Sequence, residues 1–168
     1  MNNTTVKDQS LWRVAAIDAV LLTVACCIPT FSHLVAWPLY QLNPMLLVLL
    51  AGMLLVRDRR NAYLLAALLP VVSMLAVGMP TPLKALCMMA EYSTVVLVSG
   101  RLQAWNARFV GTLGAMLLAM LAGKVLYYLL KALLLAPAVL VSTPVAVQLL
   151  VVLAAAAIYA AIVKVRNK

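Results

Sequence analysis

Basic side chains occur in four clusters along this chain, and long apolar segments separate each cluster from the next. The clusters comprise Lys7 with Arg13, residues 57–60, residues 101–108 and residues 164–168. Between successive clusters lies a connection that contains no charged residue: 37–43, 78–81 and 136–143. Because basic loops stay on the cytoplasmic side of a membrane, this alternation predicts six transmembrane helices with both termini in the cytoplasm.

The composition is typical of a protein that lies almost entirely in or near the bilayer. Hydrophobic residues make up 67% of the 168 positions and charged residues only 10%, whereas a soluble domain has about 45–50% and about 25%. The net charge of +9 is concentrated at the ends of the apolar segments, so it indicates membrane topology rather than nucleic-acid binding. The three cysteines lie inside apolar segments and predict no disulfide or metal site. We expect a single all-α integral membrane domain over residues 1–168.

Six apolar segments are the predicted spans: about 13–34, 37–56, 61–77, 82–100, 109–135 and 144–163. A helix needs about 20 residues to cross the hydrocarbon core of a membrane. The second segment does not offer them in one piece, because the apolar residues after Pro44 reach only about 18 Å as a helix. We therefore expect a broken or re-entrant connection between the first and second spans, sheltered by surrounding protein.

Two charged residues lie inside the fourth predicted helix, where each costs roughly 2.5–3.5 kcal/mol on insertion scales. Lys84 and Glu91 are spaced so that they share one face of this helix, and Lys124 lies on the fifth, antiparallel helix. Counted from the inner ends, Glu91 lies about 15 Å deep, Lys84 about 25 Å and Lys124 about 24 Å. Two cations above one anion predict a polar pocket that opens to the outside, and we assign Tyr92 and Tyr128 to it as well.

These charges also have simpler interpretations. Lys84 and Lys131 lie near enough to the outer interface for their side chains to extend to it and contact nothing else. We expect this for Lys131, and the sequence leaves it open for Lys84. Glu91 and Lys124 lie too deep for that, and their alternative is a purely structural ion pair between two helices. For these two residues we favour the pocket.

The first predicted helix carries features of its own. Ala15 and Ala19 have the spacing of small residues that lets another helix approach closely, and Asp18 lies beside them, so we assign all three to a partner interface. His33 is the only histidine; we expect it to form interfacial hydrogen bonds, and it would serve as one axial ligand if the cargo were a haem. The sequence contains no nucleophile–base–acid set, phosphate-binding glycine loop or metal cluster, so we expect neither an enzyme nor a resident metal or cofactor.

Three features of the sequence resemble the substrate-binding S component of energy-coupling factor (ECF) transporters, the vitamin importers of prokaryotes. The first is the layout of six helices in 168 residues with both ends inside. The second is the proline-rich turn at 78–82, followed by the M-x-x-E sequence from Met88 to Glu91 and by Gly100. The third is the pattern Ala15-x-x-x-Ala19, which is similar to the motif through which S components contact their coupling subunit.

The resemblance implies a mechanism for this chain. Cargo would bind from outside in a pocket of the last three helices that includes Glu91. The connection after the first helix would close the pocket with His33, Trp37 and Tyr40. A transmembrane coupling subunit and two ATPase subunits would then associate with the protein, which would topple in the bilayer and release the cargo inside. ATP would be used only by these partners, and the location would be the prokaryotic cytoplasmic (inner) membrane.

The charges indicate which class of cargo such a pocket accepts. Lys84 and Lys124 predict at least one carboxylate or phosphate, and the uncharged aromatic lid predicts a flat or apolar body. A carboxylated vitamin fits this description, and so does a porphyrin with its propionates above and His33 near the metal; we rank the vitamin first because more such cargoes exist.

A competing interpretation belongs to a different class of protein. In a small structural or assembly protein, such as a subunit of a morphogenesis complex, buried charges hold partner helices together. Glu91 and Lys124 would then form an interhelical pair, and there would be no pocket.

Overall fold

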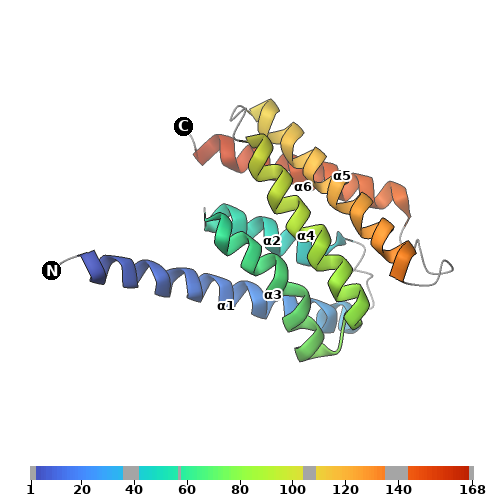
Figure 1. Ribbon diagram of the computed structural model, residues 1–168, viewed down its shortest axis with the longest axis horizontal. Coiled ribbons are helices and arrows are strands. Elements are labelled where there is room, and N and C mark those ends of the chain that lie inside the picture. Colours follow the sequence, from blue (N-terminus) through green and yellow to red (C-terminus); the bar gives the residue numbers. More distant parts are fainter. Residues whose placement is uncertain (1–2, 36–41, 57, 104–108, 135–143, 167–168) are drawn as a thin grey trace.

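The computed structural model describes residues 3–35, 42–56, 58–103, 109–134 and 144–166, in which the secondary structure consists of α-helices and their caps. Six helices follow one another along the chain (Figure 1): α1 (Asn3–Val35), α2 (Pro44–Leu55), α3 (Arg59–Val77), α4 (Pro82–Gln103), α5 (Phe109–Leu134) and α6 (Val145–Arg166). Five of them, all except α2, are long and apolar enough to cross a membrane. The described chain is therefore a multi-pass α-helical membrane protein, as predicted.

The helices pack in an order that leaves α1 at one side of the molecule. The most extensive contact is between the antiparallel neighbours α4 and α5, and α4 also packs against α3. Helix α1 packs against α2 and α3, while its N-terminal part extends away from the other helices (Figure 1). Helix α6 lies against α5 and contacts α2.

Helix α2 is short because of the residues at its two ends. Asn43 adopts the left-handed conformation with φ of 47°, and Pro44 follows as the first helical residue, where its missing N–H group is no loss. The helix ends at Leu55, and Val56 is extended with φ of −117°. Twelve residues give a length of about 18 Å, whereas a membrane span requires about 30 Å.

Two polar contacts show which half of the bundle α2 occupies. At its N-terminal end, Asn43 contacts Glu91 in the middle of α4. At its C-terminal end, Arg166 from the last turn of α6 donates to the Leu54 carbonyl. Helix α2 therefore extends from the level of Glu91 to the end of the bundle at which α6 terminates.

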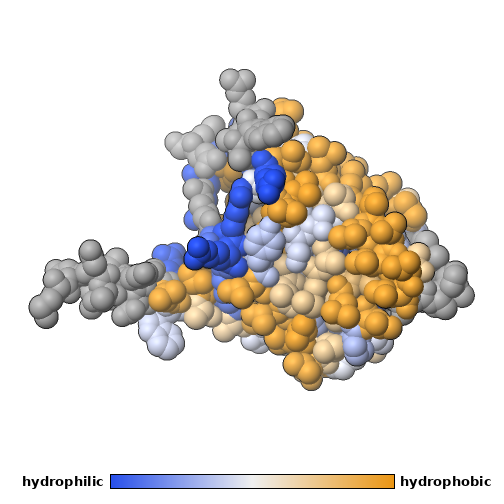
Figure 2. Space-filling view, viewed as in Figure 1, coloured by the Kyte–Doolittle hydropathy of each residue, from blue (hydrophilic) through white to orange (hydrophobic). Residues whose placement is uncertain are grey.

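The core is apolar and centres on α2 and the faces that surround it. Leu49, Leu65, Leu69, Val95 and Met116 are among its fully buried members. Large apolar side chains also cover much of the visible surface (Figure 2), which a protein surrounded by lipid requires. Hydrophilic side chains gather mainly where α3 begins and where α4 and α6 end.

The turn between α3 and α4 contains the proline-rich sequence. Gly78 ends α3 in the left-handed conformation with φ of 76°, which glycine adopts without steric cost. The Met79–Pro80 peptide bond is cis. The Ser73 hydroxyl donates a hydrogen bond of 2.8 Å to the Met79 carbonyl and ties the turn back to α3.

Candidate functional site

An ion pair lies at the centre of the interface between α4 and α5. Nζ of Lys124 is 2.8 Å from Oε1 of Glu91, and the exposed fractions of the two side chains are 19% and 2%. The two residues come from different helices and meet because α4 and α5 are antiparallel. The direct interhelical pair, predicted from the sequence as the alternative to a pocket, is therefore present.

Asn43 joins this ion pair to the start of α2. Its side-chain amide nitrogen donates to Oε1 of Glu91 at 3.3 Å, and its amide oxygen accepts from the Tyr92 hydroxyl at 3.1 Å. Tyr92 is completely buried. Asn43, Glu91, Tyr92 and Lys124 thus form one connected polar group, which we call the central polar cluster.

Gly123 permits the close approach of α5 to α4 at this cluster. A Cβ atom at position 123 would lie 2.9 Å from the Glu91 carbonyl oxygen and 3.0 Å from a methyl group of Val95. Since no side chain separates the two backbones at this point, the next residue, Lys124, is carried to within reach of the carboxylate. Gly123 was not among the predicted site residues. Its place directly before a lysine inside an apolar segment could have indicated that another helix approaches closely there.

Aromatic and basic side chains continue from the cluster along α5. The Tyr127 ring has Nζ of Lys124 at 5.4 Å and Nζ of Lys131 at 5.9 Å from its centroid. Lys131 is only 5% exposed. The prediction that Lys131 extends to the interface and contacts nothing is therefore wrong, because the residue packs on the Tyr127 ring through a cation–π contact.

The remaining predicted residues of α4 and α5 lie at different distances from the cluster. Lys84 is exposed near the start of α4. Tyr128 is half-buried and turned toward α6, where its hydroxyl donates 2.7 Å to the side-chain oxygen of Gln148. Tyr128 thus holds α5 and α6 together rather than joining the central polar cluster.

Three predicted lid residues are not placed in this arrangement. The backbone of His33 belongs to α1, which continues to Val35. Trp37 and Tyr40 lie outside the residues that the structure describes. Their assignment to a lid stays a prediction.

Asp18 makes a contact inside the molecule. Its carboxylate accepts a hydrogen bond of 2.9 Å from the side-chain amide of Asn61, which is buried on α3. Ala15 and Ala19, one turn apart on the same helix, are exposed. The alanines are therefore accessible to a partner, whereas Asp18 already connects α1 to α3.

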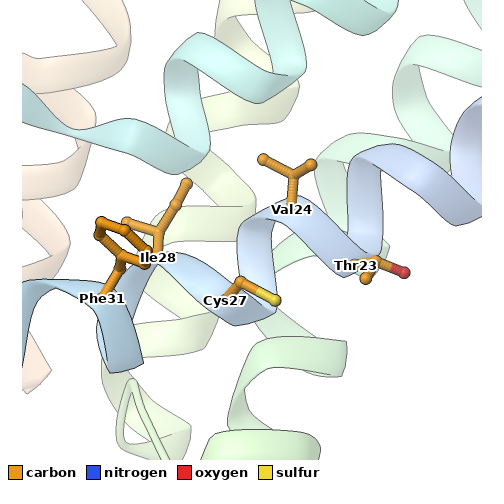
Figure 3. A pocket seen from close by; sticks show the side chains of 5 residues that line it. All are labelled: Thr23, Val24, Cys27, Ile28 and Phe31. Atoms are coloured by element: carbon orange, nitrogen blue, oxygen red, sulfur yellow. The ribbon is translucent and has the colours of Figure 1, made fainter. Parts of the chain in front are cut away.

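A separate apolar hollow of about 260 Å³ lies along α1. Its lining comes from successive turns of that helix (Figure 3): Thr23, Val24, Cys27, Ile28 and Phe31. It contains no charged side chain, so it has none of the chemistry of the central polar cluster. Within the described ranges, no three histidine, cysteine or acidic residues come together as metal ligands.

The sequence matches no protein-family profile and no curated protein, and no solved structure matches the fold. A buried carboxylate, an amide and a partly exposed ammonium group at the end of a short helix can recognise a polar or anionic group within an otherwise apolar bundle.

Proposed function

We propose that this protein is the substrate-binding membrane subunit of an ECF-type micronutrient importer in the prokaryotic inner membrane, with both termini in the cytoplasm. It would bind a small anionic cargo, vitamin-like or haem-like, from the outside. A coupling subunit and two ATPases would then energise its delivery to the cytoplasm.

The observation that carries this proposal is the start of α2 at the central polar cluster. The contact between Asn43 and Glu91 places the first residue of α2 at the level of Glu91. Helix α2 therefore does not extend into the half of the bundle that contains Lys84 and Lys131. Broken helices that begin in the middle of a bundle are a recurring way to build substrate sites in transporters. The N-terminus of such a helix and a nearby ammonium group both favour an anion.

The charges on α4 and α5 support an anionic cargo. Within the described residues of α4 and α5, Glu91 is the one carboxylate, whereas Lys84, Lys124 and Lys131 lie on the same two helices. Lys124 is held by Glu91 yet keeps about a fifth of its side chain exposed. A carboxylate or phosphate of the cargo would approach Lys84 first and then Lys124, with Glu91 keeping Lys124 in position.

The assembly-protein interpretation is the second candidate, and one observation favours it. The ion pair between Glu91 and Lys124 is complete within the chain, with Asn43 as a third member. Asp18 and Asn61 form a second internal polar contact between helices. Both contacts would serve equally well to hold a scaffold of helices together.

The deciding experiment is a search for cargo with matched charge variants. The full-length protein is purified in mild detergent, co-purifying small molecules are identified by mass spectrometry, and a panel of vitamins and haem is screened for thermal shifts. We expect one carboxylated or phosphorylated compound to raise the melting temperature. The double variant Glu91→Gln/Lys124→Gln, which removes both charges together and leaves no charge unpaired, should fold but lose this shift.

Lys164→Gln serves as the control. The Lys164 ammonium group lies over the ring of Phe109, the first residue of α5, and so lies away from the central polar cluster. It should retain the cargo-dependent shift. A wild-type protein that purifies empty and responds to no compound would overturn the importer proposal. A double variant that binds cargo as well as wild type would show that the pair is structural.

A further inference from the structure

A second group of charged residues lies at the opposite end of α2 from the central polar cluster. Exposed basic side chains meet where α3 begins and where α4 and α6 end, the region in which hydrophilic side chains gather in Figure 2. They are Arg59, Arg60, Arg101, Lys164 and Arg166. We call them the basic end. Asp58 is the acidic residue beside them.

Two of these arginines are fixed in place by backbone carbonyl groups. Arg59 donates to the carbonyl of Gly100 in the last turn of α4, and Arg166 donates to that of Leu54 in the last turn of α2. Such carbonyls have no partner within their own helix. Because a carbonyl is neutral, these bonds hold the guanidinium groups in position without cancelling their charge.

The other polar contacts of the basic end also leave its charge in place. The carboxylate of Asp58 accepts from the backbone N–H of Arg60 at 2.9 Å, where it caps α3. Nζ of Lys164 lies 5.3 Å from the centre of the Phe109 ring. Within the described part of the chain, five positive side chains and one carboxylate leave this end with a net charge of +4.

Apolar side chains lie immediately beside these charges. Leu55, Val110 and Val165 are exposed to 55%, 76% and 74%. Basic residues at the ends of membrane-spanning helices lie at the boundary between hydrocarbon and lipid headgroups. The phosphate groups of the lipids lie at this level, and guanidinium groups bind phosphate through paired hydrogen bonds.

We propose that the basic end is a binding site for the phosphate headgroup of an anionic phospholipid. The site is built from three helices, two of its four arginines, Arg59 and Arg166, already donate to backbone carbonyl groups, and the neighbouring apolar residues would contact the acyl chains. This proposal is independent of the identity of any cargo. It holds equally for an importer and for an assembly protein.

The test compares lipids on the purified full-length protein in a neutral detergent. Phosphatidylglycerol or cardiolipin should raise the melting temperature and remain bound in native mass spectrometry, whereas phosphatidylcholine should do neither. Inorganic phosphate is added in a separate arm. An equal shift with phosphatidylcholine, or an equal shift with inorganic phosphate alone, would overturn the proposal.

The variant Arg60→Gln/Arg101→Gln tests the site without removing a bond that fixes the fold, because neither side chain makes a contact that ties helices together in the described structure. We expect anionic lipid to bind about 30-fold more weakly, at about 1 kcal/mol for each basic residue near the membrane surface. The control Lys7→Gln/Arg13→Gln removes the same charge from the N-terminal part of α1, which extends away from the other helices, and should bind as wild type. An equal loss in both variants would show general charge attraction and refute a site.

Discussion

Gly123 lies directly against the backbone of Glu91, so that a Cβ atom at position 123 would be 2.9 Å from the Glu91 carbonyl oxygen. This contact sets the separation of α4 and α5 at the depth where their charges meet. Small residues at such crossings are how helices pack closely within a membrane. The ion pair between Lys124 and Glu91 therefore depends on a residue that carries no functional group.

The substitution Gly123→Ala tests this dependence. The added methyl group meets a backbone atom, which cannot move aside as a flexible side chain would, so we expect a loss of about 1–3 kcal/mol in the free energy of unfolding. Gly114→Ala on the same helix is the control, because nothing lies within 4 Å of a Cβ there. Unfolding by denaturing detergent, followed by circular dichroism, measures both variants. Equal stability of the two would contradict the close packing.

The two charges of the central polar cluster should depend on each other. Lys124→Gln leaves the buried Glu91 carboxylate without its cation, and we expect a loss of about 3 kcal/mol in stability. Glu91→Gln should cost less, because the glutamine oxygen still accepts a hydrogen bond from the Lys124 ammonium group, which is also less buried than Glu91. The double variant should be more stable than Lys124→Gln alone. A double-mutant cycle on unfolding free energies gives the coupling, and additive effects would exclude a pair.

Asn43 should matter for two separate reasons. Tyr92→Phe removes only the hydrogen bond to the Asn43 side chain and should cost about 0.5–1.5 kcal/mol. Asn43→Gly removes both side-chain hydrogen bonds but tolerates the left-handed backbone, whereas Asn43→Ala also strains it by about 1–2 kcal/mol. We therefore expect the alanine variant to melt at the lowest temperature of the three. A glycine variant less stable than the alanine variant would refute the role of the backbone.

The contact between Asp18 and Asn61 should be needed for stability. Asp18→Ala leaves the buried Asn61 amide without its acceptor, which we expect to cost about 1–3 kcal/mol. Asp18→Asn retains an acceptor oxygen and should be nearly neutral. Thermal unfolding of the purified protein compares the two. If Asp18→Ala is neutral in isolation and instead weakens binding of a partner, the predicted interface role of Asp18 is correct.

Much of the architecture follows from hydropathy and charge along the chain. Apolar segments separated by basic clusters predict membrane helices, because burial of uncharged segments and retention of basic loops are properties of local sequence. The short α2 was predicted from Pro44 and the basic cluster that follows it, and the structure confirms a helix of twelve residues. Glu91 and Lys124 stood out for the same reason, since a charge inside an apolar segment is costly wherever the helix lies.

The contacts of these residues depended on the tertiary structure. Asn43 and Asn61 each bond to residues more than 40 positions away, Glu91 and Asp18, and no local pattern specifies such partners. Lys131 was expected at the interface, yet the packing of α5 places it on the Tyr127 ring. Sequence alone determined which segments are helices in a membrane and which charges are exceptional there. Only the packing of one helix on another decided which residues these charges contact. The rotation of each helix and the distance between helix backbones, as at Gly123, are set by contacts across the bundle.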